Sequence, residues 1–254
     1  MCFAGKGGVG KTTSLVLFLK YAISKHPNLK KLVIDADPDA NIADLVGKNI
    51  EFHDTIGGKV TEIGRKIARK EIPSHLSERS LIEEEVLRDI FNMGDFDLLV
   101  QGRSEGEGCY CSINSILKNL LRVLSETYDL IVIDSPAGLE FFARKTSTNV
   151  DDLVIVSDMS KMGFHTVQRI IEIKNEVSLD FKKIWILGNR FNEKSKELFV
   201  NRIKEILENN AELLGFFSYN DEIQKFNLSN KSLIDLPDTN LVYKESIEIY
   251  SKII

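Results

Sequence analysis

Apolar runs of strand length alternate with longer stretches of helical periodicity along this chain, and this alternation limits the possible fold more than any other feature. It predicts an α/β fold: a mainly parallel β-sheet with helices on both faces. Strands inside such a sheet are apolar on both sides because both of their faces are buried, and the runs here have that composition. The runs cover residues 31–36, 96–101, 128–134, 152–158 and 183–189, and the helical stretches cover 12–24, 112–124 and 166–177.

The length and composition favour one domain. With 254 residues, of which 43% are hydrophobic, the chain is long enough to bury a large core, and we expect a single domain over residues 1–254. Residues 50–92 interrupt the alternation and predict a helical insertion between the second and third core strands. The first strand, Cys2–Ala4, is short, which suggests that the native chain starts upstream of Met1.

The charge and the hydropathy disfavour two classes of partner. A formal net charge of -5 gives no general attraction to nucleic acid or to an anionic membrane surface. No apolar run approaches the roughly 20 residues that span a bilayer, and the N-terminus lacks the pattern of a signal peptide. We therefore expect a cytoplasmic protein that binds neither nucleic acid nor membranes.

A glycine-rich loop after the first strand carries the clearest functional signal. Its sequence, GKGGVGKTT over 5–13, fits the pattern G-x-x-x-x-G-K-[ST] between a short strand and a helix. In such a loop Lys11 neutralises the β- and γ-phosphates, Thr12 offers its hydroxyl to Mg²⁺, and Thr13 offers one to the α-phosphate. The sequence therefore predicts a nucleoside triphosphate with Mg²⁺, held by Gly5, Gly7, Gly8, Val9, Gly10, Lys11, Thr12 and Thr13.

Aspartates at the ends of two strands predict the acidic part of the same site. The sequence VIDADPDAN (33–41) places Asp35 and Asp37 on one side of the chain, at the sheet edge where open α/β folds bind nucleotides. The sequence LIVIDSPAG (130–138) ends an apolar strand in Asp134, as in proteins that hold a Mg²⁺-bound water there. Gly138 leaves the following loop free to close on a γ-phosphate.

A second lysine in the glycine-rich loop gives a more specific resemblance. The sequence KGGVGKT (6–12) resembles the deviant phosphate loop of an ATPase family that includes Min-system and partitioning ATPases, the nitrogenase iron protein and nickel-insertion factors. In that family this lysine reaches into the partner's active site, which implies an ATP-dependent homodimer with Lys6 and Lys11 acting in catalysis. The resemblance also implies that Asp37 orients the attacking water and that Asp35 assists Mg²⁺ through water.

Two later segments complete the nucleotide site by the same resemblance. The sequence WILGNRF (185–191) delivers Asn189 at a strand end, where an asparagine of this family reads the adenine edge, and Arg190 adjoins it. The sequence GFFSYND (215–221) is similar to the family's strand and loop beside the adenine, with Tyr219 as a candidate contact.

Two of the three cysteines, Cys109 and Cys111, stand two residues apart after a glycine-rich turn. Thiolates are soft ligands that suit nickel, zinc, copper(I) or iron–sulfur clusters, but one pair supplies only two of the four sulfurs of a tetrahedral site. In a two-fold dimer the same patch meets itself, so one pair from each subunit gives four sulfurs. We therefore expect a nickel or zinc ion at a dimer interface.

The segment around these cysteines resembles one group within this ATPase family more than the others. The sequence GRSEGEGCYCSINSILKNLL (102–121) is similar to that of accessory ATPases which insert nickel into carbon monoxide dehydrogenase and acetyl-CoA synthase, and this implies a nickel metallochaperone for one of these apo-enzymes. One alternative is a positioning or partitioning ATPase, because DSPAGLE (134–140) is closer to the Min version of this loop. Another is a redox ATPase with a shared iron–sulfur cluster, because C-x-C does not specify its metal.

Overall fold

The computed structural model describes residues 1–73, 76–103, 109–137, 150–176, 181–204, 207, 211–229 and 231–254. For residues 109–112 and 175 it describes the backbone only. No helix within these residues is both long enough and apolar enough to span a lipid bilayer.

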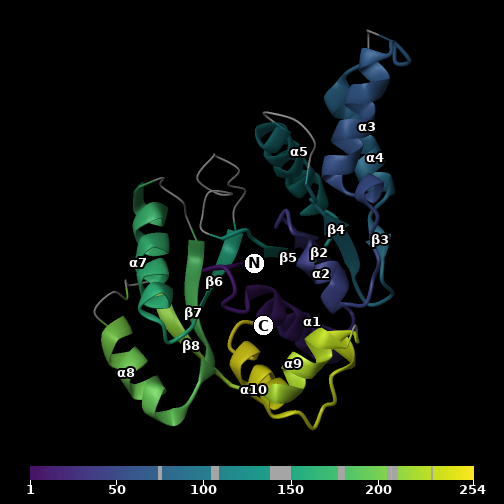
Figure 1. Ribbon diagram of the computed structural model, residues 1–254. Coiled ribbons are helices and arrows are strands. Elements are labelled where there is room, and N and C mark those ends of the chain that lie inside the picture. Colours follow the sequence, from purple (N-terminus) through teal and green to yellow (C-terminus); the bar gives the residue numbers. More distant parts are fainter. Residues whose placement is uncertain are drawn as a thin grey trace.

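One eight-stranded sheet forms the centre of the molecule (Figure 1). Its strand order is β3-β4-β2-β5-β1-β6-β7-β8, and all neighbouring strands are parallel except the edge pair β3 and β4. The mainly parallel sheet predicted from the apolar runs is therefore confirmed. The strands are β1 (Cys2–Gly5), β2 (Lys31–Asp35), β3 (Phe91–Asn92), β4 (Asp97–Val100), β5 (Leu130–Asp134), β6 (Val150–Ser157), β7 (Phe181–Phe191) and β8 (Ala211–Ser218).

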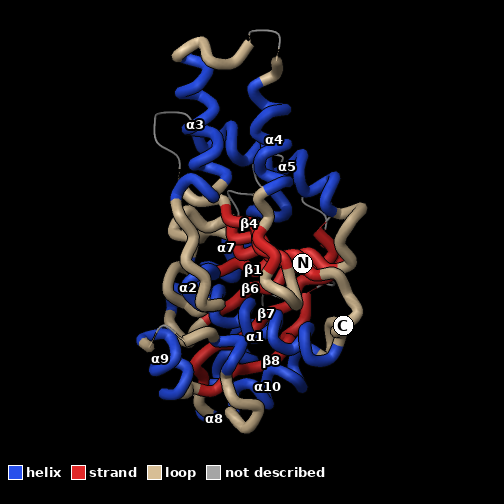
Figure 2. Tube along the Cα trace, turned by 90° about the vertical axis from the view of Figure 1, so that its right-hand side faces the viewer, coloured by secondary structure: helices blue, strands red, loops and turns tan. Residues whose placement is uncertain are grey.

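Helices cover both faces of the sheet, as predicted (Figures 1 and 2). Helices α1 and α10 pack on one face, and α5, α7 and α8 pack on the other. The α-helices are α1 (Lys11–Lys25), α2 (Asn41–Leu45), α3 (Ile56–Ala68), α4 (Glu78–Arg88), α5 (Cys109–Leu124), α7 (Lys161–Glu176), α8 (Glu193–Ile203), α9 (Asp221–Leu228) and α10 (Leu241–Tyr250). Among the described residues, the 3₁₀ turn η1 (Phe52–Asp54) lies between α2 and α3, and η2 (Leu233–Asp235) lies between α9 and α10.

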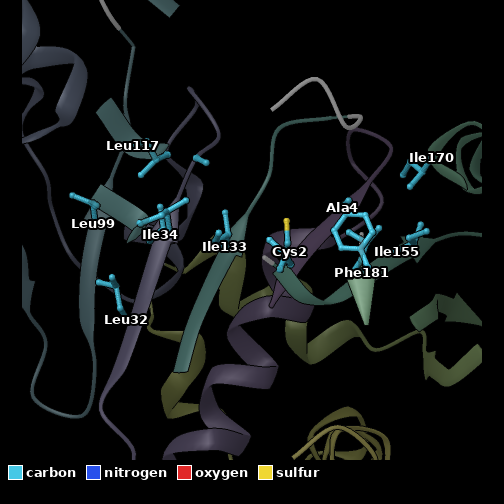
Figure 3. Close-up of a cluster of buried hydrophobic side chains, with 14 of the residues drawn as sticks. Cys2, Ala4, Leu32, Ile34, Leu99, Leu117, Ile133, Ile155, Ile170 and Phe181 are labelled. Atoms are coloured by element: carbon cyan, nitrogen blue, oxygen red, sulfur yellow. The ribbon is translucent and has the colours of Figure 1, made fainter. Parts of the chain in front are cut away.

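Alternate residues of the central strands supply two hydrophobic cores. Cys2 and Ile34 belong to the core under α5 and α7, whereas Phe3 and Val33 belong to the core under α1. Figure 3 shows part of the first core, with strand side chains facing Leu117 of α5. Each fully buried large apolar side chain stabilises the fold by about 1.5–3 kcal/mol, so this two-sided burial explains why the strand sequences are apolar throughout.

Helices α3 and α4 project beyond the rest of the molecule in both views (Figures 1 and 2). They occupy the segment for which the sequence predicts an insertion, and β3 follows them as an antiparallel edge strand on β4. Thr55 and Ser77 cap the two helices by accepting hydrogen bonds from backbone N–H groups. The facing sides bury Ile63 and Val86, which join the core under α5.

Candidate functional site

The glycine-rich loop runs from the end of β1 to the start of α1, and at two of its glycines a Cβ atom would overlap a neighbouring residue. Gly10 is the N-cap of α1 with φ of 95°, in the left-handed region, and a Cβ atom there would overlap the side-chain nitrogen of Asn189. Gly5 lies so close to the carbonyl oxygen of Val156 that a Cβ atom would overlap it as well. These contacts fix the loop against β6 and β7.

Three hydrogen bonds from side chains hold the loop in its shape. Asn189 Nδ2 donates to the carbonyl oxygen of Val9 at 2.8 Å, and Arg190 Nη1 donates to that of Gly8 at 3.4 Å. Lys11 Nζ donates to the carbonyl oxygen of Lys6 at 3.5 Å and is only 7% exposed. The loop therefore holds its lysine at the N-terminus of α1, where the helix dipole also favours a bound anion.

Thr12 and Asp134 form the part of the site that suits Mg²⁺. Thr12 Oγ1 donates to Asp134 Oδ2 at 2.7 Å, while Asp134 Oδ1 is buried and has no hydrogen-bond partner in the described part of the chain. Burial raises the pKa of Asp134 to about 6, against its hydrogen bond from Thr12 and the charge of Lys11. A hydroxyl and a carboxylate oxygen are hard ligands of the kind that Mg²⁺ prefers, so these residues fit the ion.

Asp35 at the end of β2 and the aspartates in the loop after it occupy two different environments. Asp37 is half-buried and lines the cavity above the phosphate loop, as does the exposed Asp39. Asp35 is fully buried, and its two oxygens accept hydrogen bonds from the backbone N–H groups of Asp37 at 3.2 Å and Ile42 at 2.8 Å. Burial, together with the charge of Asp134, raises the pKa of Asp35 to about 8.

The position of Asp35 differs from the expectation that both side chains emerge at the sheet edge. Strand alternation gives the side to which Asp35 points, but the turn into α2 closes over its carboxylate. Asp35 therefore shapes the loop that carries Asp37 and does not line the cavity. Its participation in Mg²⁺ binding through water stays a prediction.

Two adjoining cavities lie beside the loop. The larger has a volume of about 590 Å³ and the smaller about 30 Å³. The larger is lined by Gly7, Gly8, Gly10, Lys11, Thr12, Thr13, Asp37, Asp39, Asn41, Asp44, Leu45, Pro136, Ala137, Arg190 and Asn227. The smaller is lined by Thr13, Leu17, Asn189, Arg190, Ser218, Tyr219, Asn220, Ile223, Gln224, Asn227 and Val242.

The smaller cavity brings together the residues assigned by resemblance to the adenine. Asn189 and Arg190 come from β7, and Tyr219, 53% exposed, follows β8. Asn227 of α9 lines both cavities, and no motif in the sequence predicts this position. One asparagine near the end of an eight-residue helix does not indicate a ligand contact until the fold shows that the helix lies beside the phosphate loop.

The predicted metal ligands Cys109 and Cys111 are only partly placed. They begin α5, but their side chains lie outside the described residues, as does Gly138. Cys2 is fully buried, and burial raises the pKa of its thiol, which disfavours the thiolate that a metal ion needs. Within the described residues, no three His, Cys, Asp or Glu side chains are grouped to hold a metal.

Comparison with known proteins identifies relatives over the whole length. The family model of the AAA domain matches residues 2–185. The chain is 39% identical to the uncharacterized ATP-binding protein MJ0685 of Methanocaldococcus jannaschii, over 99% of this chain and 96% of that protein. It is 28% identical to the carbon monoxide dehydrogenase accessory protein CooC of Rhodospirillum rubrum, over 91% of this chain and 88% of that protein.

Solved structures show the same fold. A ParA family ATPase from Chlorobium tepidum superimposes with a TM-score of 0.70 and 17% identity, covering 97% of both chains. The septum site-determining protein MinD of Pyrococcus horikoshii, complexed with Mg-ADP, superimposes with a TM-score of 0.67 and 16% identity, covering 99% of this chain and 93% of that one. The chain therefore belongs to the AAA-domain family of P-loop ATPases that includes the MinD, ParA and CooC proteins.

Proposed function

We propose that this protein hydrolyses MgATP as a nucleotide-dependent homodimer and carries nickel or zinc for a metalloenzyme client, in the manner of a CooC-type accessory ATPase. The observation that carries the ATPase part is the pair of Thr12 and Asp134 beside the phosphate loop. The pair leaves one buried carboxylate oxygen of Asp134 without a hydrogen-bond partner among the described residues, and Thr12 itself lines the cavity of about 590 Å³. A buried oxygen of this kind is costly unless a ligand satisfies it.

Different residues around the cavity have different roles in ATP hydrolysis. The loop N–H groups and Lys11 bind and orient the phosphates, and Thr12 with Asp134 would hold Mg²⁺, which supplies charge that offsets the negative charge of the phosphates. Asp37 lines the cavity and orients the attacking water by accepting a hydrogen bond from it. Lys6 is half-buried, and its ammonium group pairs with none of the described residues, which suits a contact with the second subunit.

The metal-carrying part rests on two supports. Cys109 and Cys111 begin α5, and Arg103, which follows β4 earlier in the same stretch of chain, forms an ion pair with Asp39 at the cavity. The relative from Rhodospirillum rubrum, named for carbon monoxide dehydrogenase, matches nearly the whole chain. Four thiolates from two subunits complete a tetrahedral site for a soft or borderline metal, and the client is apo carbon monoxide dehydrogenase or acetyl-CoA synthase.

The ATPase activity is tested by phosphate release. Wild type is expected to release phosphate from MgATP, and Asp37→Asn is expected to lower the rate by at least about a hundredfold while ADP still binds. Leu198→Ala is a matched control, because Leu198 is 67% exposed on α8, away from the cavity. Equal rates for wild type and Asp37→Asn would refute the role of Asp37.

The metal site is tested by native mass spectrometry with and without ATP. We expect one Ni²⁺ or Zn²⁺ per dimer in wild type and none in the Cys109→Ser, Cys111→Ser double variant, whereas Cys2→Ser keeps the metal if it folds. Equal metal content in the wild type and the double variant would refute the metallochaperone proposal. A visible absorption band after anaerobic purification would favour the iron–sulfur alternative instead.

The packing of α10 disfavours its use as a lipid anchor. A Min-type ATPase attaches to lipid through an amphipathic helix whose apolar face is free. Here α10 buries Val242, Ile249 and Tyr250 against α1, and the Tyr250 hydroxyl donates to the carbonyl oxygen of Ser14 at 2.7 Å. Cosedimentation with anionic vesicles and with duplex DNA in the presence of ATP tests both positioning activities, and we expect binding to neither.

A further inference from the structure

Two cavities meet at the carboxyl edge of the sheet, and three residues line both of them. The larger cavity contains the phosphate loop, and the smaller one is lined by Asn189 and Tyr219. The residues common to both are Thr13, Arg190 and Asn227. A nucleotide with its phosphates in the larger cavity and its base against Asn189 and Tyr219 places its ribose between them, beside these three side chains.

Of the three residues, Asn227 is the one that offers a side-chain amide. Arg190 already donates to the carbonyl oxygen of Gly8, and Thr13 lies in the first turn of α1, next to the phosphate loop. The side chain of Asn227 is exposed, and its amide has no hydrogen-bond partner in the described chain. An amide offers both an acceptor and donors, and so matches two neighbouring ribose hydroxyls, each of which can donate and accept.

The helix that carries Asn227 is anchored at its start. Asn220 Oδ1 accepts hydrogen bonds from the backbone N–H groups of Glu222 at 3.0 Å and Ile223 at 3.2 Å. Asn240 Nδ2 donates to Glu222 Oε2 at 2.5 Å, which ties the same turn to the segment before α10. Ile223 packs against the core under α1. The backbone of Asn227 is thus held in place before a ligand arrives, so a contact by its side chain requires little further ordering.

We propose that Asn227 hydrogen-bonds the ribose hydroxyls of the bound nucleotide and makes the site prefer ribonucleotides over deoxyribonucleotides. The inference rests on the proposed ATP site and goes beyond it by assigning a residue that selects the sugar. A nucleotide that lacks the hydroxyl leaves the amide without its partner, and the loss of one such hydrogen bond lowers affinity by about tenfold.

The test is calorimetric binding of ADP, 2′-deoxy-ADP and 3′-deoxy-ADP with Mg²⁺, because diphosphates are not consumed during the titration. Wild type is expected to bind ADP about tenfold more tightly than at least one of the deoxy analogues. Asn227→Ala is expected to bind ADP as weakly as that analogue and to leave the affinity for the analogue unchanged. Lys225→Ala is the matched control, since Lys225 is exposed on α9 and lines neither cavity.

Two outcomes would overturn the inference while leaving the proposed function intact. One is equal binding of the three nucleotides by wild type, and the other is equal weakening of all three in Asn227→Ala. A wild-type protein that binds no adenine nucleotide would overturn both the inference and the ATPase proposal, so the two failures are distinguishable.

Discussion

Two buried aspartates in register on neighbouring strands set the electrostatics of the site. Asp35 ends β2 and Asp134 ends β5, and the strand pairing places them opposite each other. Burial and the charge of Asp134 raise the pKa of Asp35 to about 8, while burial raises that of Asp134 to about 6. Without a cation nearby, the folded protein therefore holds protons that the unfolded chain releases.

This arrangement predicts how stability depends on pH. A carboxyl with a raised pKa binds its proton more tightly in the folded state, so the free energy of unfolding falls as pH rises from the unfolded pKa, near 3.8, toward 8. A single such group loses up to about 1.4 kcal/mol per pH unit within that window. Thermal unfolding of the nucleotide-free protein between pH 5 and pH 8.5 should show this fall. Asp35→Asn should flatten it, and an equally steep profile for that variant would contradict the assignment.

A second prediction concerns the glycine that caps α1. Gly10→Ala places a Cβ atom at φ of 95° and against Asn189 Nδ2, which holds the carbonyl oxygen of Val9. We expect a loss of stability of about 1–3 kcal/mol in urea unfolding, and nucleotide affinity weakened by at least about tenfold, because the loop must shift. In the control Gly64→Ala, on α3, a Cβ atom meets nothing within 4 Å, and the change should stabilise by about 0.5–1 kcal/mol. The opposite order of stabilities would count against this account of the loop.

At the scale of elements, the central strands were predictable and the short elements were not. Burial on both faces makes a parallel strand apolar throughout. The apolar runs at 31–36 and 128–134 therefore have bounds that agree with those of β2 and β5 to within two residues. The five-residue α2 and the two-residue β3 depend on contacts with segments far away in the sequence, and no periodicity fits into such lengths. For the same reason Asn227 of α9 could be placed at the site only by the fold.

An ion pair between Arg103 and Asp39 joins the loop after β2, which is predicted to bind nucleotide, to the segment after β4, which leads to the predicted metal ligands. Asp39 lies on the loop that lines the cavity, and Arg103 follows β4 on the way to Cys109 at the start of α5. The backbone N–H of Gln101 donates to the carbonyl oxygen of Asp35 at 2.8 Å, so both segments are held together at this edge. A shift of the loop that carries Asp39 can therefore be transmitted to Gln101 and Arg103.

This contact predicts a coupling between nucleotide and metal. Arg103→Gln and Asp39→Asn should each reduce the effect of a non-hydrolysable ATP analogue on the affinity for Zn²⁺, measured by competition with a chelator. Both side chains of the pair are largely exposed, so the change in unfolding free energy should stay below about 1 kcal/mol. If the pair transmits the effect, the double variant should show no more loss than either single variant. Additive losses would show that the two residues act independently.

At the scale of the whole molecule, the predicted dimer makes each active site depend on the other chain. Lys6→Ala and Asp37→Asn proteins should each be inactive alone while still binding ADP. If Lys6 acts across the interface, a mixed dimer has one complete site, and random mixing in equal amounts should restore about a quarter of wild-type phosphate release. Activity of the mixture no higher than the mean of the two separate proteins would place the action of Lys6 within its own subunit.

Because α3 and α4 project from the rest of the molecule, a small tilt of these helices would move their far ends by several ångströms. Thirteen residues of α3 extend about 20 Å at the usual helical rise, and they leave the body where Gly57 N–H donates to the carbonyl oxygen of Gln101 at 2.9 Å. Gln101 also donates its backbone N–H to Asp35, at the start of the loop that carries Asp37 and Asp39. A small rotation of α3 at Gly57 would therefore produce a larger displacement at the far end of the helix. A tilt of about 10° would carry its far end by about 3–4 Å, a stroke that a pair of fluorescent probes could register.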